Sequence, residues 1–335
     1  MLMKSILGSA ALALVLAAAP LATQARELRV SSFEPPQGFY SAKVLQAWID
    51  RVNPTLTPEN QFRLYPGSIL GAPPAQAELV KAGVADVALV VPTYTPGLFP
   101  LSSVVEVPGM VQTSGQGTAI LNAAQEAGLL AGEYADYKVL ALFTTPGYRF
   151  LMTGDGVAKP ADLAGLKLRT PSPFGSELLA LLGASGVAIP APQVYENLER
   201  GVVAGAVWVM DAYRTFRLDE VAPAVTSLRF TASPMAILMN KTTWDALPEA
   251  DRAAIDAAAG RAMAEWIAGV VDATDAEIEA SFRAAGSVKF IDLDDAAVAE
   301  WQAALAPAPA AWLAGQPDAR AAQAALDIAQ GLAGQ

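Results

Sequence analysis

Short apolar runs alternate with longer helical patterns along most of the chain. In the first part, strands are predicted at 28–31, 62–65 and 87–91, and helices at 40–52 and 76–82. Apolar residues in the segment 40–52 recur at spacings of three and four, which places them on one face of a helix. Apolar strands separated by helices are typical of a parallel sheet that is covered on both faces. The pattern therefore predicts an α/β unit.

The same pattern returns in a second block. Strands are predicted at 139–143, 167–170, 187–189 and 206–210, with helices at 174–182 and 194–200. Two such series in a chain of 335 residues predict two α/β lobes. One long helical pattern then runs from 248 to 285, long enough at about 1.5 Å per residue to lie across both lobes. A break near 272–274 stays open, and the tail after Trp301 is predicted to be helical and packed on the outside.

The N-terminus has the order of a secretory signal peptide. Lys4 precedes an apolar stretch at 6–19, Pro20 ends it, and small residues follow up to Ala25. The stretch is shorter than the roughly 20 residues that span a bilayer. We therefore assign residues 1–25 to a signal peptide and predict a periplasmic mature chain without stable membrane insertion. The alternative is an uncleaved N-terminal anchor.

Composition narrows the function classes. The sequence has no Cys and no His, which removes disulfides, thiol catalysis, the commonest general base and the usual zinc ligands. The 22 basic residues form no cluster against 33 acidic ones, so nucleic acid is not an expected partner. No nucleophile stands beside a base, and no cofactor fingerprint is present. We therefore expect neither an enzyme nor a cofactor. Because the chain is acidic overall, an anionic ligand would have to be bound by a few well-placed basic side chains.

Four segments carry a family resemblance, in the right order and with the right spacing. They are LYPGSILG at 64–71, ELVKAGVAD at 78–86, DLAGLKLRTP at 162–171 and QVYENLERGVVAG at 193–205. With these segments the chain resembles the solute-binding proteins of tripartite ATP-independent periplasmic (TRAP) transporters over nearly its whole mature length. The segment at 162–171 is the most specific of the four.

The resemblance implies a clamshell of two α/β lobes with a long helix bracing both. We expect lobe I to comprise residues 26–146 plus 235–272, and lobe II residues 147–234 plus 273–335. The crossing segments near 144–148 and 230–235 would act as hinges. A small organic acid would be captured in the cleft as its carboxylate and delivered to the TRAP permease subunits in the membrane. Because relatives are mostly monomers, a monomer is expected.

Arg169 is the first candidate ligand residue. It ends a predicted strand, and ligands in open α/β sheets collect beyond the carboxyl ends of strands. A guanidinium can hold a carboxylate with two parallel hydrogen bonds, the role that the resemblance implies here. The alternative is a solvated arginine at a strand end. The resemblance also implies that Arg149 contributes to ligand binding near Arg169. The alternative for Arg149 is a structural salt bridge between the lobes. Tyr148 would stack on the ligand or fill the seam between the lobes.

The strand at 206–210 departs from the family pattern. Relatives that bind a metal beside the ligand carry a carboxylate next to an aromatic residue there; Trp208 matches the aromatic residue, but Val207 cannot ligate a cation. We therefore expect no metal. Trp208 and Met210 instead predict apolar pocket walls suited to an aliphatic or aromatic acid, unless both face the core. Further candidates from the family layout are Phe33, Tyr94 and Phe174.

Two other functions remain open. A periplasmic enzyme acting on a small carboxylic acid would convert the ligand, whereas a binding protein would return it unchanged. A ligand-binding partner of a sensor protein would share both fold and site.

Overall fold

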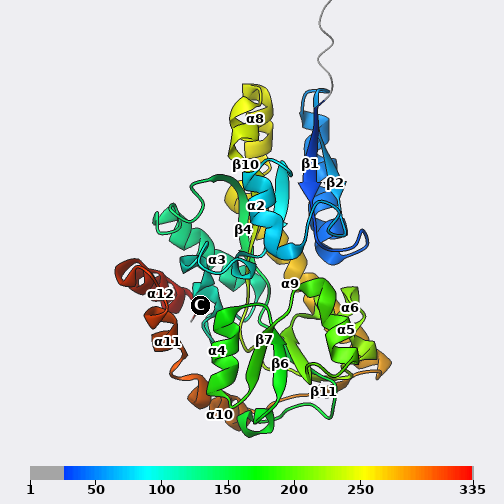
Figure 1. Cartoon of the computed structure of the whole chain (residues 1–335), viewed down its shortest axis with the longest axis vertical. Coiled ribbons are helices and arrows are strands. Elements are labelled where there is room, and N and C mark those ends of the chain that lie inside the picture. The colour runs from blue at the N-terminus through cyan, green and yellow to red at the C-terminus, as the bar shows by residue number, and fades with distance from the viewer. Residues whose placement is uncertain (1–25, 334–335) are drawn as a thin grey trace, which may run out of the picture.

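The structure is a computed structural model that describes residues 26–333. The predicted signal peptide at 1–25 lies outside the described residues. Within the described part of the chain, no helix is both long and apolar enough to cross a membrane. Two lobes follow one another along the long axis of the molecule, each built on its own sheet (Figure 1).

The sheet of lobe I has five strands in the order β2-β1-β3-β10-β4. Their bounds are β1 (Arg26–Ser31), β2 (Asn60–Tyr65), β3 (Val87–Val90), β4 (Tyr137–Thr144) and β10 (Pro234–Asn240). The helical segments of this lobe are η1 (Tyr40–Leu45), α1 (Gln46–Val52), α2 (Gln76–Lys81), η4 (Pro92–Tyr94), η5 (Leu101–Glu106), α3 (Ser114–Glu126) and α7 (Lys241–Ala246). β10 runs antiparallel to both β3 and β4. The sequence pattern indicated a parallel sheet, and the sheet is mixed, because β10 brings the chain back from the other lobe. The predicted α/β class is confirmed.

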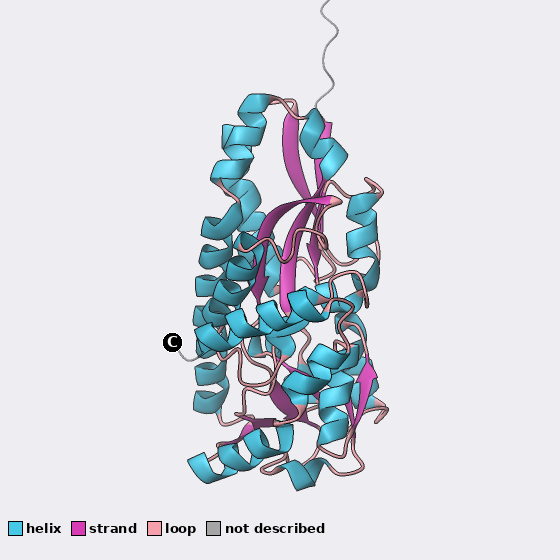
Figure 2. Cartoon of the chain, turned by 90° about the vertical axis from the view of Figure 1, so that its left-hand side faces the viewer, coloured by secondary structure: helices cyan, strands magenta, loops and turns pink. Residues whose placement is uncertain are grey.

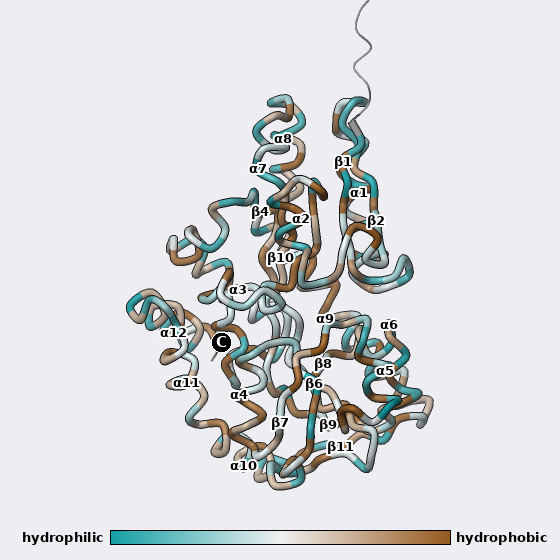
Figure 3. The backbone as a smooth tube through the Cα atoms, viewed as in Figure 1, coloured by the Kyte–Doolittle hydropathy of each residue, from teal (hydrophilic) through white to brown (hydrophobic). Residues whose placement is uncertain are grey.

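The sheet of lobe II has six strands in the order β11-β9-β5-β8-β6-β7. They are β5 (Arg149–Met152), β6 (Lys167–Thr170), β7 (Ser185–Ala188), β8 (Gly205–Trp208), β9 (Ala224–Thr226) and β11 (Lys289–Ile291), with helices α4 (Pro173–Leu181), α5 (Val194–Glu199) and α6 (Met210–Thr215). β5, the strand by which the chain enters this lobe, is antiparallel to β8 and β9. Apolar segments gather along the strands of both sheets, whereas the tip of α8 and the loops around α5 are hydrophilic (Figure 3).

Two crossing segments join the lobes, and they are hydrogen-bonded to each other. The Thr145 N–H donates to the Ser233 carbonyl at 3.0 Å, and the Phe230 N–H donates to the Tyr148 carbonyl at 2.8 Å. The segments coincide with the hinges expected from the sequence. Because each segment is short and tied to the other, a rotation of the lobes has to be absorbed by a few residues here.

The helix predicted from 248 to 285 is in fact two helices, α8 (Glu249–Ala257) and α9 (Gly260–Ala285). The break falls at Gly260, whose φ of +67° is a conformation that residues with a Cβ rarely adopt. The Trp48 indole N–H donates to the Ala258 carbonyl at the break, at 2.9 Å. α9 is unbroken at 272–274. At about 1.5 Å per residue its 26 residues span about 39 Å, and it packs on β4 and α3 of lobe I and on α6 of lobe II. The predicted brace is confirmed (Figure 2).

The C-terminal tail is helical, as predicted, and it contributes to the core. Its helices are α10 (Asp295–Leu305), α11 (Ala308–Ala314) and α12 (Ala319–Ala333). Trp301 and Trp312 are fully buried, and their indole N–H groups donate to the Ala158 carbonyl and to the Ser103 hydroxyl. The expected division places 273–335 in lobe II, but α12 packs on α3 and η5 of lobe I. We therefore propose that the tail runs beneath lobe II and returns to lobe I with α11 and α12 (Figure 1).

Replacing Trp301 with alanine tests the contribution of the tail. Trp301 has no exposed surface and packs on Phe150 with ring centres 5.1 Å apart, so Trp301→Ala should lower the free energy of unfolding by about 3–5 kcal/mol. Urea unfolding of the mature chain measures this. The neighbouring exposed substitution Glu300→Ala should change the free energy by less than about 0.5 kcal/mol. Equal effects of the two substitutions would show that the tail does not stabilise the fold.

Candidate functional site

Arg169 lies near the carboxyl end of β6, in the interior of the protein. β6 pairs in parallel with β7 on one side and β8 on the other, so its backbone is fixed from both sides. Two prolines flank Ser172, which caps α4 by accepting the Gly175 N–H at 2.9 Å. The strand therefore ends directly after Arg169 and Thr170, and the chain turns into a helix. The guanidinium is held where a strand, a turn and a helix start meet.

The guanidinium of Arg169 makes three hydrogen bonds. Nε donates to the Ile189 carbonyl at 2.9 Å, Nη1 to the Val207 carbonyl at 3.4 Å, and Nη2 to the Tyr94 hydroxyl at 3.1 Å. Its central carbon lies 4.2 Å from the centre of the Trp208 ring, in cation–π geometry. An arginine has five N–H donors, so one donor on each terminal nitrogen is left over. Two N–H groups are the number that a two-pronged bond to a carboxylate requires.

Arg169 is 0% exposed, and no Asp or Glu among residues 26–333 forms an ion pair with it. A buried charge without an opposite charge is costly, and structures normally pair such charges. The alternative of a solvated arginine at a strand end is therefore wrong, because burial removes the side chain from water. The arrangement suits an anion that arrives from outside.

A small cavity lies between the lobes. Arg169 does not line it, but Tyr94 and Trp208, which contact Arg169, do. Four of the predicted site residues line it: Phe33, Tyr94, Tyr148 and Trp208. Phe33 and Tyr94 belong to lobe I, and their ring centres are 6.3 Å apart. Trp208 belongs to lobe II and stacks on Phe216 with ring centres 5.3 Å apart. The cavity volume is about 30 Å³, room for two or three water molecules, so the lobes are closed and a ring-sized ligand requires them to part.

Two buried carboxyl groups line the same cavity, Glu34 from lobe I and Asp211 from lobe II. Burial raises the pKa of Glu34 to about 7, although the N–H groups of Tyr40 and Ser41 oppose the shift. Burial raises the pKa of Asp211 well above its usual value, and the nearby charges of Glu34 and Asp275 add to the effect. Negative charge is therefore disfavoured at this end of the cavity.

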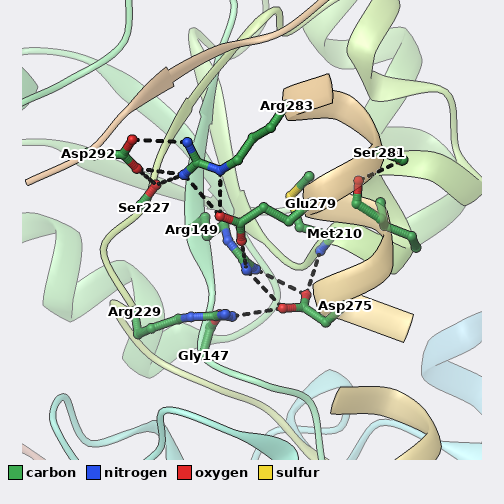
Figure 4. A network of polar contacts seen from close by, with 11 residues as sticks. Gly147, Arg149, Met210, Ser227, Arg229, Asp275, Glu279, Ser281, Arg283 and Asp292 are labelled. Carbon is green, nitrogen blue, oxygen red and sulfur yellow. Dashed lines mark hydrogen bonds and ion pairs between the residues drawn. The ribbon is translucent and has the colours of Figure 1, made fainter. Parts of the chain in front are cut away.

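Arg149, the second candidate, is already paired. Nη1 and Nη2 donate to the two carboxylate oxygens of Asp275 at 3.0 and 2.8 Å, and Nη2 also reaches Glu279. Arg229 contacts the same carboxylate of Asp275 at 3.1 Å (Figure 4). Burial alone would lower the pKa of Arg149, but these ion pairs outweigh it and raise the pKa above its usual value. The contacts favour a structural salt bridge between β5 and the bracing helix α9 over a ligand role.

The remaining candidates lie away from the cavity. Met210 is fully buried at the start of α6 and does not line the cavity; its backbone N–H donates to Asp275 at 3.3 Å. Phe174 lines a separate hollow of about 460 Å³ between α4, α11 and the loop after η4, which it shares with Trp312.

The sequence analysis missed several residues that line the cavity, among them Tyr40, Asp211 and Phe216. Asp211 follows the end of β8, so its place beyond a strand end was an available signal. Tyr40 starts the predicted amphipathic helix at 40–52, so the sequence analysis counted it as a helix residue and did not consider its hydroxyl as a polar group of the site.

Comparisons place the chain among known proteins. The family model described as "Bacterial extracellular solute-binding protein, family 7" matches residues 32–314. The outer membrane transporter protein TsaT of Comamonas testosteroni is 30% identical over 318 residues, 90% of each chain. A TRAP solute-binding protein from Rhodoferax ferrireducens T118, solved with copurified benzoate, has a TM-score of 0.87 and 25% identity over 92% of this chain and 98% of its own. A marine metagenome TRAP solute-binding protein specific for aromatic acid ligands was solved with 3-hydroxybenzoate. It has a TM-score of 0.86 and 28% identity to this chain, over 92% of this chain and 99% of its own.

The ion pair between Arg149 and Asp275 predicts a large effect on stability. Both side chains are at least 97% buried, and Asp275 pairs with both Arg149 and Arg229. Asp275→Ala leaves Arg229 without this carboxylate and Arg149 with Glu279, and should lower the free energy of unfolding by about 3–5 kcal/mol. The double substitution Arg149→Met with Asp275→Leu removes both charges and should recover most of the loss. Urea unfolding monitored by tryptophan fluorescence measures both.

The matched control is Glu277→Ala on the same helix, where the carboxylate is 71% exposed and pairs with Arg214. We expect less than about 0.5 kcal/mol from this surface pair. If Asp275→Ala unfolds at the same urea concentration as the wild type, Arg149 is free to serve another role.

Proposed function

We propose an aromatic carboxylate as the cargo of this chain, which belongs to family 7 of the bacterial extracellular solute-binding proteins, the solute-binding proteins of TRAP transporters. Such proteins capture a small organic acid and work with a membrane permease, so the family, the two-lobed fold and the carrier role predicted from the sequence are confirmed. The finer proposal is a compact acid with one carboxylate and an apolar ring, held between Arg169 and the aromatic walls of the interlobe cavity.

The observation that carries this proposal is the unpaired charge of Arg169. The guanidinium is fully buried, keeps two N–H donors unused and has the face of Trp208 against it. A carboxylate supplies the missing charge and accepts two parallel hydrogen bonds. The Tyr94 hydroxyl, which contacts Nη2 from the opposite lobe, is placed to share the same oxygen.

The walls of the cavity support an apolar, flat body for the ligand. Phe33, Tyr94, Trp208 and Phe216 contribute rings from both lobes. Offset and edge-on contacts between rings add attraction beyond the burial of area. Two similar solved proteins, 25% and 28% identical to this chain, are described with benzoate and with 3-hydroxybenzoate.

Capture works by closure. In the open form the carboxylate reaches Arg169 through water; when the lobes close, water leaves and the attraction between the charges strengthens. Bending at the crossing segments around Thr145 and Ser233 provides the motion. The closed lobes then form the surface that the permease recognises.

The proposal also covers the compartment, the oligomeric state and the fate of the ligand. Residues 1–25 direct export, the mature chain acts in the periplasm as a monomer, and the ligand is released unchanged rather than converted. Mass analysis of ligand recovered after denaturation checks the last point, because an enzyme would return a product.

Removing the charge of Arg169 should abolish selective acid binding. The mature chain is stripped of ligand by unfolding and refolding, and calorimetry then measures benzoate, lactate, succinate, glucuronate and neutral benzamide. We expect benzoate to bind and benzamide not to bind. Arg169→Met should weaken benzoate binding by about 30- to 5,000-fold, the equivalent of about 2–5 kcal/mol.

The control is Arg200→Met, because Arg200 is 69% exposed, follows the end of α5 and pairs with Glu196 of that helix. The affinity of this variant for benzoate should equal that of the wild type. Thermal unfolding of each variant confirms that it folds. Undiminished benzoate binding in Arg169→Met, or a preference for lactate, succinate or glucuronate over benzoate, would overturn the proposal.

A further inference from the structure

The end of the cavity formed by Glu34, Tyr40 and Asp211 carries a second set of polar groups. Glu34 and Tyr40 come from lobe I and Asp211 from α6 of lobe II, and all three line the cavity beside Phe33 and Trp208. Their exposed fractions are 3%, 4% and 3%. Polar side chains buried to this degree normally have hydrogen-bond partners. A buried polar atom without a partner here would therefore be available to bind a ligand group.

Glu34 is satisfied by the backbone. One of its carboxyl oxygens accepts the Tyr40 N–H at 2.7 Å and the Ser41 N–H at 3.3 Å. These bonds hold Glu34 against the start of η1 and fix the position of the Tyr40 backbone. Glu34 is therefore part of the frame of the cavity.

Tyr40 and Asp211 are different, because each keeps a buried polar atom without a partner. The Tyr40 hydroxyl and the Oδ1 atom of Asp211 make no hydrogen bond in the structure. The hydroxyl offers a donor, and the carboxyl oxygen offers an acceptor. A single group that satisfies both must accept one hydrogen bond and donate another. A hydroxyl group does this, whereas an ammonium group has no lone pair for the tyrosine.

The acidic groups around these atoms disfavour an anion. Burial raises the pKa of Asp211, and the nearby carboxylates of Glu34 and Asp275 add to the effect. A second carboxylate on the ligand would meet the same burial and the same acids. The cavity is thus lined by the polar groups of Tyr40 and Asp211 and by the rings of Tyr94 and Trp208, and the last two residues contact Arg169, which does not itself line the cavity.

We propose that Tyr40 and Asp211 form a hydroxyl-binding subsite, which selects aromatic acids that carry a hydroxyl group away from the carboxylate. This inference rests on the proposed function, because Arg169 must first hold the carboxylate. The subsite is assembled only when the lobes close, since its two members belong to different lobes. A ligand hydroxyl therefore bridges the lobes and stabilises the closed form.

Paired ligands test the subsite. Calorimetry on the stripped mature chain compares benzoate and phenylacetate with their 3- and 4-hydroxy and 3- and 4-fluoro derivatives, and includes isophthalate and 3-(aminomethyl)benzoate. A site built to hydrogen-bond a hydroxyl discriminates strongly against analogues that lack it. We expect one hydroxylated acid to bind about 10- to 100-fold more tightly than both its parent and its fluoro analogue. Isophthalate should bind more weakly than benzoate.

Two variants connect this preference to the residues. Tyr40→Phe and Asp211→Asn should each reduce the hydroxyl preference, the ratio of the affinities for the hydroxylated acid and for its parent, to about threefold or less. Tyr40→Phe removes only an unpaired buried hydroxyl, so it should fold as the wild type does. Tyr195→Phe is the matched control, because the Tyr195 hydroxyl is exposed and bonds Glu220 outside the cavity; it should keep the full preference.

The outcomes separate the two proposals. Acid binding that depends on Arg169 but shows no hydroxyl preference, or a preference that survives both variants, overturns the subsite alone. Tightest binding of 3-(aminomethyl)benzoate would identify a cation site and would also overturn it. Failure of every acid to bind would instead overturn the proposed function.

Discussion

Burying a guanidinium obliges a protein to supply an anion or to leave the charge for a ligand to neutralise. This protein has one buried arginine of each kind, and the two lie on opposite sides of strand β8. Arg149 on β5 and Arg169 on β6 flank β8 in the sheet of lobe II. Arg149 receives the carboxylates of Asp275 and Glu279 from α9, whereas among the described residues Arg169 receives two carbonyls, a hydroxyl and a ring face but no carboxylate. The same chemical group thus anchors the scaffold at one position, and at the other it is the binding group of the proposed function.

The anchored arginine determines how the lobes can move. Asp275 joins α9 to β5 and, through Arg229, to a crossing segment, while the earlier part of the helix packs on lobe I. Opening the cleft at the cost of a buried ion pair would be unfavourable, so the motion has to pass through the crossing segments and a bend or slide of α9. The ion pairs keep the sheet of lobe II fixed to its helix, and Arg169 therefore travels with a rigid lobe toward Tyr94.

Local patterns predicted seven of the eleven strands that the described residues form, and the place of Arg169 near a strand end, because apolar runs, turn residues and a strand end are encoded within a few residues of one another; β5, β9, β10 and β11 were not predicted. Local patterns were insufficient where partners are distant in the chain. Asp275 lies 126 residues beyond Arg149, so no local signal distinguished a paired arginine from a binding one. The break at Gly260 depended on one backbone angle, and helical periodicity continues on both sides of it. Asp211 and Tyr40 line one cavity but belong to different lobes and stand far apart in the chain, so no local pattern connects them.

The acidic character of the chain adds a constraint on selectivity. A net charge of −11 repels an anion at long range, but salt screens this repulsion within about 8 Å, whereas a buried guanidinium is screened much less. Any small carboxylate satisfies Arg169 equally well, so the arginine secures the class of ligand without choosing its member. The choice falls to groups that meet the rest of the molecule: the rings, which require a flat apolar body, and the buried carboxyl groups of Glu34 and Asp211, which disfavour a second anion. On the proposed function, discrimination among acids therefore rests on the cavity residues that do not bind the carboxylate.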